Sequence, residues 1–95
     1  MNEIILGDAY KLIKGDFQID LGKKEFQILE LLMLSPNTAI GRERFIEKIW
    51  GFDSEAEYNT IEVYVSFIRR KLSALGSSTE IRSIRGVGYT LGAQK

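Results

Sequence analysis

The chain has 95 residues, no cysteine and no histidine, and its 13 Lys/Arg residues balance its 13 Asp/Glu residues. This length fits one domain with one hydrophobic core. The missing residue types exclude disulfides, thiolate metal sites and a histidine general base. No apolar run approaches the roughly 20 residues of a membrane-spanning helix, and the N-terminus "MNEIILGDAY" lacks signal-peptide features. We therefore expect a cytoplasmic protein with no metal and no cofactor.

The zero net charge hides an uneven distribution along the chain. Residues 1–58 carry seven Lys/Arg and eleven Asp/Glu, whereas residues 59–95 carry six Lys/Arg and two Asp/Glu. A basic C-terminal part can still meet a polyanion, because the local distribution of charge matters more than its sum. An imbalance of this size also arises by chance in a short chain, so charge alone assigns no function.

The first 21 residues predict a small antiparallel sheet. A short apolar run at 4–6 ends at "GDA", and residues 10–14 and 17–21 then alternate apolar and polar side chains around a "GD" turn. We expect the sheet over residues 4–21 to have one packed face and one face in water.

Residues 23–75 change to the period of an α-helix and predict a core of three helices. The first begins at Lys23 and ends at "SPN" (35–37), and the next three residues, 38–40, allow only a stub of strand. "GRERFIEKIWG" (41–51) predicts the second helix, which Gly51 ends.

The third helix is predicted over residues 59–75, after an acidic loop at 51–58. Asn59 is the expected N-cap, Glu62 completes a capping box, and Gly76 ends the helix.

This third helix carries apolar side chains on two opposite sides. Four of them fall within about 60° of one another and predict the core face: Ile61, Val65, Ile68 and Leu72. The opposite side mixes apolar, polar and cationic groups: Val63, Phe67 and Arg70, flanked by Thr60, Tyr64, Ser66 and Lys71. The helix is then either buried on both sides or exposes a binding surface. Unpaired charges are costly inside a protein, so the cations favour a binding surface, and an α-helix fits the DNA major groove.

The stretch "IRSIRGVGYTL" (81–91) predicts a β-hairpin with Arg85 at its bend. Gly86 and Gly88 permit a positive φ or a close backbone approach to a partner. We expect Ile84 to anchor the hairpin to the core and Tyr89 to brace its far side. A guanidinium on a narrow ribbon suits the DNA minor groove, although a solvated arginine at a turn is also common.

Four segments, in this order and spacing, resemble the OmpR/PhoB-type winged-helix effector domain of bacterial two-component response regulators. They are "LGKKEFQILELL", "GRERFIEKIWG", "NTIEVYVSFIRRKL" and "IRSIRGVGYTL", and the resemblance runs from about Ile4 to Leu91. It implies an α+β winged helix-turn-helix, one domain over residues 1–95, with an N-terminal antiparallel sheet, three helices and a C-terminal hairpin wing. It also implies sequence-specific binding of double-stranded DNA for transcriptional regulation.

The resemblance, together with the residue pattern, gives the expected contacts. The helix over 59–75 would enter the major groove, and the wing would bring Arg85 to the adjacent minor groove. The expected DNA-contacting residues are Trp50, Thr60, Val63, Tyr64, Ser66, Phe67, Arg69, Arg70, Lys71, Ser83, Arg85, Gly86 and Tyr89. The loop over 51–58 would touch RNA polymerase through Asp53, Glu55 and Glu57. The family's receiver domain is absent from these residues, and members bind tandem half-sites as head-to-tail dimers, so we expect a monomer without DNA.

The third helix departs from the family pattern. Phe67 stands where many members have a base-reading arginine, so readout there would be an apolar contact with thymine or a sugar. Tyr64 replaces a common histidine, Asn59 a common arginine, and Ser66 an arginine that binds phosphate in some members. Each change removes a potential cation, which predicts weaker and less salt-dependent binding per domain. Gly22 replaces the usual threonine cap of the first helix.

Two other function classes compete with DNA binding. A protein-interaction module would use the apolar patch of Val63, Tyr64 and Phe67. An enzyme would need an acid–base group in a pocket, and no spacing among the carboxylates, lysines and tyrosines suggests such a site. We therefore do not expect an enzyme.

Overall fold

The computed structural model describes residues 4–51 and 58–93. In chain order the elements are β1 (Ile5–Gly7), η1 (Asp8–Tyr10), β2 (Lys11–Lys14), β3 (Phe17–Asp20), α1 (Lys23–Leu34), β4 (Ile40–Gly41), α2 (Arg42–Phe45), η2 (Ile46–Trp50), α3 (Tyr58–Ala74), β5 (Thr79–Ile84) and β6 (Gly88–Ala93). The strands form two antiparallel sheets, ordered β1-β2-β3 and β4-β6-β5. This order confirms the predicted α+β winged helix-turn-helix.

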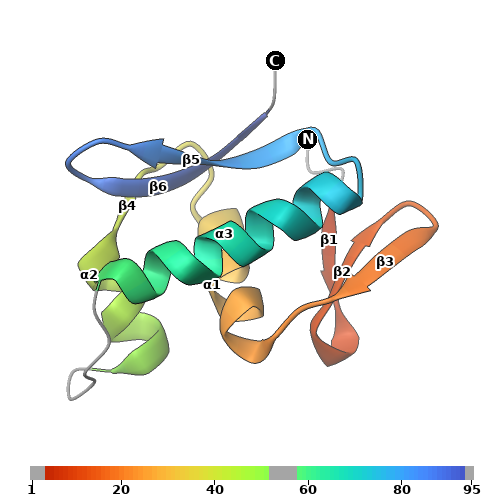
Figure 1. Cartoon of the computed structure of the whole chain (residues 1–95), viewed down its shortest axis with the longest axis horizontal. Helices are drawn as coiled ribbons and strands as arrows, with labels where there is room; N and C mark the ends of the chain where they lie inside the picture. Colours follow the sequence, from red (N-terminus) through yellow and green to blue (C-terminus); the bar gives the residue numbers. More distant parts are fainter. Residues whose placement is uncertain (1–3, 52–57, 94–95) are drawn as a thin grey trace.

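Helix α3 lies at the centre of the fold, and the other elements pack around it. The β5–β6 hairpin runs along one side of it, and the β1–β3 sheet lies at its C-terminal end (Figure 1). The turn of the hairpin lies toward the same end of the molecule as the N-terminal half of α3 and helix α2 (Figure 1). A hydrophobic core takes residues from both sheets and all three α-helices: Ile4, Leu12, Leu21, Ile28, Leu29, Leu32, Ile40, Phe45, Ile61, Val65, Ile68, Leu72, Ile81, Tyr89 and Leu91.

The N-terminal sheet forms as its alternating pattern predicts. Lys14 pairs with Phe17, so Gly15 and Asp16 make a two-residue turn, and Gly15 adopts a φ of 59°. Strands β1, β2 and β3 align Leu6, Leu12 and Ile19 on the face that packs on the core. The other face is in water, and the side chains of Lys11 and Asp20 form an ion pair there.

Helix α1 matches its predicted bounds, whereas the second helix is irregular. After the single α-helical turn of α2, η2 is a π-helical turn, closed where the Gly51 N–H donates to the Ile46 carbonyl at 2.9 Å. Gly51 ends the helix as predicted, with a φ of 92°. Within the described residues, no helix is both long enough and apolar enough to cross a membrane.

Helix α3 begins one residue earlier than predicted. It starts at Tyr58, which places Asn59 inside its first turn, so the prediction that Asn59 is the N-cap is wrong. The C-terminal prediction is confirmed. Gly76 has a φ of 68°, its N–H donates to the Ser73 carbonyl at 2.9 Å, and the Ser77 N–H donates to the Leu72 carbonyl at 3.0 Å. These two bonds form a Schellman motif, which satisfies carbonyls at the helix end.

The C-terminal hairpin is the wing, and three residues connect its strands. Ile84 pairs with Gly88, so Arg85, Gly86 and Val87 form the turn, and the Val87 N–H donates to the Ile84 carbonyl at 3.0 Å. Gly86 adopts the expected positive φ, 76°. We call Arg85, Gly86 and Val87 the wing turn.

Two expectations for the wing need correction. Ile84 is only half-buried and lies outside the hydrophobic core, to which the wing is attached by Ile81, Tyr89 and Leu91. Gly88 allows a close backbone approach, but the neighbour is β4 of the same chain. A Cβ at Gly88 would lie 2.0 Å from the Ile40 carbonyl oxygen, so only glycine fits beside β4.

Candidate nucleic-acid interface

The outer side of α3 is exposed, which excludes the interpretation that this helix is buried on both sides. Val63 is 50% exposed and Phe67 38% exposed, and Arg70 is exposed next to them. We call Thr60, Val63, Phe67 and Arg70 the groove face. Its N-terminal part holds an open hollow of about 270 Å³, lined by Asn59, Thr60, Val63, Tyr64 and Phe67.

A chain of ring contacts crosses the groove face and ends in a cation on each side. The ring centroids of Trp50 and Tyr64 are 5.6 Å apart, and those of Tyr64 and Phe67 are 6.1 Å apart. Lys24 Nζ lies 5.2 Å from the Trp50 ring, and Arg70 Cζ lies 5.4 Å from the Phe67 ring. Aromatic and cation–π contacts of this kind favour fixed ring positions. The aromatic side chains at the groove face are therefore held in position by their neighbours.

Lys24 belongs to this arrangement, although no sequence pattern selected it as a site residue. Its Nζ donates to the carbonyl of Ile49 at 2.9 Å as well as lying over Trp50. These partners stand about 25 residues away along the chain. A local pattern cannot reveal such a contact, because it exists only once α1 and η2 have packed.

Two of the predicted cations, Arg70 and Arg85, remain available to a ligand. Both are exposed, and neither forms an ion pair with any residue that the structure describes. Arg85 occupies the first position of the wing turn. An exposed guanidinium without an ion-pair partner can approach a phosphate or a base edge without first breaking a salt bridge.

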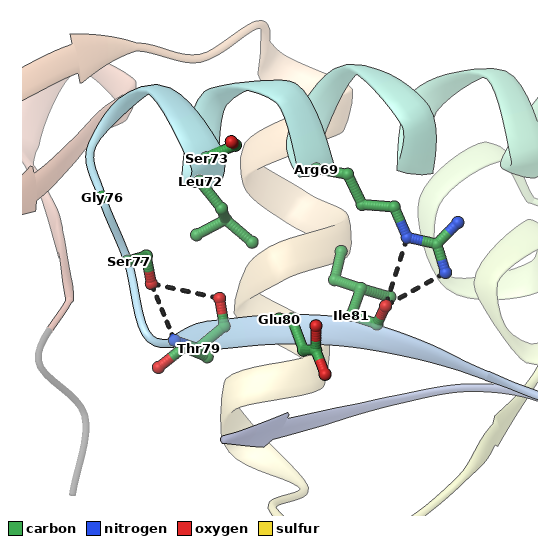
Figure 2. Close-up of a pocket in the computed structure, with 8 residues that line it drawn as sticks. All are labelled: Arg69, Leu72, Ser73, Gly76, Ser77, Thr79, Glu80 and Ile81. Carbon is green, nitrogen blue, oxygen red and sulfur yellow. Dashed lines mark hydrogen bonds between the residues drawn. The ribbon is translucent and has the colours of Figure 1, made fainter. Parts of the chain in front are cut away.

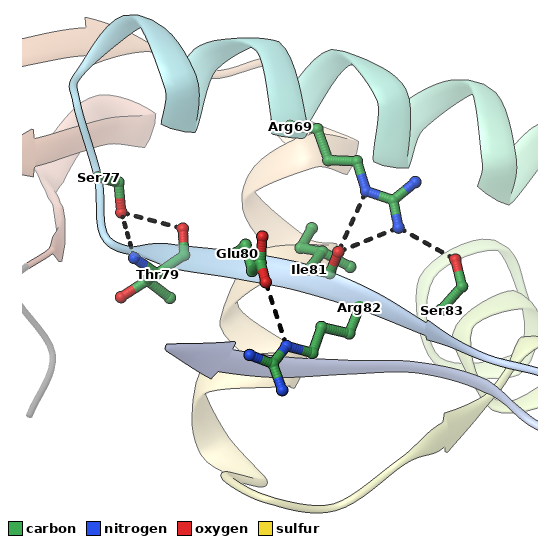
Figure 3. Close-up of polar contacts among 7 residues, drawn as sticks. All are labelled: Arg69, Ser77, Thr79, Glu80, Ile81, Arg82 and Ser83. Carbon is green, nitrogen blue, oxygen red and sulfur yellow. Dashed lines mark hydrogen bonds and ion pairs between the residues drawn. The ribbon is translucent and has the colours of Figure 1, made fainter. Parts of the chain in front are cut away.

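Arg69 lies next to Arg70 in sequence but turns the opposite way. Its side chain leaves α3 toward β5 (Figure 2). Nε and Nη2 donate to the Ile81 carbonyl at 3.1 and 3.0 Å, and Nη2 also donates to Ser83 Oγ at 3.0 Å (Figure 3). Arg69 was expected to face DNA. Its observed hydrogen bonds are instead with β5, because its position on the helix faces the wing strand.

Ser83 and Tyr89 also lie where the wing joins α3. Ser83 Oγ accepts the hydrogen bond from Arg69. Tyr89 is only 3% exposed and packs edge-to-face on Phe45, with ring centroids 6.3 Å apart. The guanidinium groups of Arg42 and Arg69 lie 5.5 and 5.9 Å from its ring centroid. Tyr89 is therefore a core residue, and its contact with DNA stays a prediction. We call Arg69, Ser83, Gly88 and Tyr89 the wing base.

Lys71 also differs from its expected role, because its charge is already paired. Its Nζ lies 2.6 Å from Glu25 Oε1, and the Glu25 side chain is only 6% exposed. The same carboxylate oxygen accepts from the Gly22 N–H at 2.5 Å, next to the first residue of α1. Lys71 thus ties α3 to the start of α1, and Glu25 compensates for the missing side-chain cap at Gly22.

The remaining predicted residues divide as follows. Ser66 Oγ donates to the Val63 carbonyl at 2.6 Å, so its hydroxyl is used within α3. A side chain at Gly86 would meet open space, so a glycine there serves backbone conformation. The predicted polymerase-contacting residues Asp53, Glu55 and Glu57 lie outside the described residues.

Comparison with known proteins connects this geometry to a family. Residues 16–91 match the family described as "Transcriptional regulatory protein, C terminal". Response regulator MprA of Mycolicibacterium vanbaalenii is 42% identical over 81 residues, which cover 85% of this chain and 35% of MprA. Response regulator ArlR of Staphylococcus haemolyticus is 37% identical over 84 residues, which cover 88% of this chain and 38% of ArlR. The chain thus spans little more than a third of the length of these relatives.

Solved structures share the fold. The C-terminal domain of the nisin resistance regulator NsrR matches with a TM-score of 0.80 and 30% identity, covering 96% of this chain and 92% of that one. The DNA-binding domain of response regulator AdeR, solved in complex with an intercistronic region, matches with a TM-score of 0.85 and 23% identity, covering 98% and 97%. At this lower identity the likeness to AdeR concerns the fold alone.

Proposed function

The chain belongs to the family of C-terminal domains of transcriptional regulatory proteins, the OmpR/PhoB-type domains of response regulators, and on this premise we propose that it binds double-stranded DNA sequence-specifically to regulate transcription. The observation that carries the proposal is the exposed groove face, with two unpaired cations at hand, one on α3 and one on the wing turn. Membership of a regulator family also disfavours an enzyme.

In the proposed complex, α3 lies in the major groove and the wing turn reaches the adjacent minor groove. The exposed rims of the hollow, Val63 and Phe67, suit thymine methyl groups, which are the apolar features of the major groove. Arg70 suits a phosphate or a guanine, and Arg85 suits a narrow, A·T-rich minor groove, where negative potential is concentrated.

The proposal extends to assembly and partners. We propose head-to-tail pairs on tandem half-sites, because each domain offers few cations on the proposed DNA-binding surface, Arg70 and Arg85, and so makes few phosphate contacts alone. The acidic loop over 51–58 is proposed to contact RNA polymerase through Asp53, Glu55 and Glu57. The family resemblance supports both proposals, and selected sites with a regular repeat spacing would support the first.

In vitro selection of duplexes from a random pool tests the main proposal directly. We expect an enriched half-site that repeats at a fixed spacing, and a loss of about fivefold or more in affinity for each replaced base pair of the motif. Binding to the selected duplex should also have a salt dependence below that of about six phosphate contacts per domain. No enrichment after selection would contradict the proposal.

A paired substitution separates DNA binding from the protein-docking alternative. We expect Arg70→Ala with Arg85→Ala to lower affinity for all duplexes by about a hundredfold, since the two sites are independent and each contributes about tenfold. If Val63, Tyr64 and Phe67 instead form a protein-docking surface, DNA affinity should be negligible in both the unsubstituted chain and the double variant. It would also leave binding of the protein partner unchanged by the double substitution.

A further inference from the structure

Arg69 joins the helix that carries the groove face to the strand that carries the wing. Its guanidinium spans from α3 to β5 and bonds the Ile81 carbonyl twice and the Ser83 hydroxyl once (Figure 3). A guanidinium is planar and rigid, so three hydrogen bonds from it fix both the distance and the orientation of the two elements. The Cζ atom of the same group also lies 5.9 Å from the Tyr89 ring centroid, on the neighbouring strand β6.

The hydrogen bonds of Arg69 lie close to the wing turn that carries Arg85. Ser83 pairs with Tyr89, and the next pair, Ile84 with Gly88, is the last before the wing turn. Ile84, the last residue of β5, lies outside the core, whereas on the other strand Gly88 is buried and paired with Gly41 of β4. Arg69 therefore holds the wing at the point from which the turn projects.

The contact between α3 and β5 changes on the other side of Arg69. A hollow of about 380 Å³ separates the C-terminal turns of α3 from the start of β5 (Figure 2). It is lined by Arg69, Leu72, Ser73, Gly76, Ser77, Thr79, Glu80 and Ile81. Leu72 and Ile81 are buried core residues that also join α3 to β5, and the hydrogen bonds of Arg69 add to this apolar contact next to the hollow.

We infer that Arg69 is a positioning residue for the wing rather than a phosphate ligand. It fixes the position of the wing turn relative to α3, so that Arg85 meets the minor groove while the groove face occupies the major groove. This inference rests on the proposed function and adds to it a coupling between the two groove contacts.

A double-mutant cycle on the selected duplex with an A·T-rich flank tests the inference. Arg85→Ala is expected to weaken binding about tenfold. Arg69→Ala should weaken binding at most about tenfold. When Arg85 is already alanine, the factor by which Arg69→Ala weakens binding should be less than half of its value with Arg85 present, because the wing then has no arginine to position. Arg70→Ala is the matched control, since its loss should be the same in both backgrounds. The inference would be overturned if, in the Arg85→Ala background, Arg69→Ala still weakened binding by at least half of the factor measured with Arg85 present.

The charge-conserving variant Arg69→Lys gives an independent readout. A lysine keeps the positive charge but cannot reproduce the fixed fork of donors, so it should behave like Arg69→Ala and abolish the preference for A·T-rich over G·C-rich flanks. A phosphate ligand would instead be largely rescued by lysine, and that result overturns the inference. Thermal unfolding checks that each variant is folded, and Ser83→Ala, which removes a single bond, replaces Arg69→Ala if the latter unfolds. Absence of specific binding by the unsubstituted chain would refute the proposed function itself, before any variant is compared.

Discussion

The groove face and the wing base both include residues of α3, but their side chains make different contacts. The groove face exposes Val63, Phe67 and Arg70 to water, whereas the wing base uses Arg69, Ser83 and Tyr89 for contacts within the chain. Arg69 and Arg70 are neighbours of the same type. Both are exposed, and what separates them is their contacts, since Arg69 donates hydrogen bonds to β5 whereas Arg70 lies over the Phe67 ring.

This contrast shows that cations next to one another in the sequence can make different contacts in the fold. Of the cations at 69–71, Arg69 bonds β5, Lys71 pairs with Glu25, and Arg70 is left unpaired among the described residues. Lys71 is thus the one member of this segment in an ion pair among the described residues, while Arg69 keeps its charge as its guanidinium links α3 to β5. The wing turn adds back a second unpaired cation, Arg85.

The two wing glycines give the largest expected difference between the regions. Gly88→Ala in the wing base places a Cβ against the Ile40 backbone and should cost about 3 kcal/mol, which lowers the Tm by about 15 °C. Gly86→Ala in the wing turn strains only a positive φ and should cost about 1 kcal/mol, or about 5 °C. Thermal unfolding followed by circular dichroism measures both. Equal Tm losses would contradict the distinction between a packed base and an open turn.

Lys71 and Arg70 form the next comparison, because they are adjacent cations with opposite expected effects. Lys71→Ala leaves the buried Glu25 carboxylate without its cation, and should lower stability by about 2 kcal/mol and the Tm by about 10 °C, with an unchanged salt dependence of DNA binding. Arg70→Ala should barely change the Tm but lower the salt slope by about 0.9, the value of one phosphate contact. Calorimetry and titrations at several salt concentrations separate the two. A lowered salt slope in Lys71→Ala would place that residue on the DNA instead.

Phe67 gives the smallest expected effect and tests how the groove face reads bases. Replacing the contacted thymine of the selected half-site by deoxyuridine removes one methyl group and should weaken binding about fourfold, from about 0.8 kcal/mol per buried methyl. The same replacement should have no effect on Phe67→Ala. Leu34→Ala, which truncates an exposed apolar side chain on α1, is the control that should keep the sensitivity. A fourfold loss that persists in Phe67→Ala would assign the methyl contact to another residue.

The sequence predicted well what depends on neighbouring residues. The Gly15–Asp16 turn, the ends of helices at Gly51 and Gly76, and the core face of α3 follow from turn chemistry and helical period, and the structure has each of them. The start of α3 was misplaced because Asn59 is a good N-cap by type, and helix ends are the least constrained part of a periodic pattern.

What the sequence could not show depends on contacts between distant segments. Arg69 and Arg70 are equivalent in a linear pattern until β5 packs beside α3. Gly88 was expected to permit a positive φ or a close backbone approach to a partner, and only the pairing of β4 with β6 reveals that the close neighbour is Ile40. Tyr89 was expected to brace the wing and contact DNA, and its burial in the core was not predicted because its position in the family motif carries no information on burial.

Amide chemical-shift changes on titration with the selected duplex test the central claim most directly. If DNA meets the groove face and the wing turn, the largest changes will fall on residues 59–70 and 85–87, and the N-terminal sheet will change little. The largest changes on β1–β3, with α3 and the wing turn undisturbed, would contradict the account.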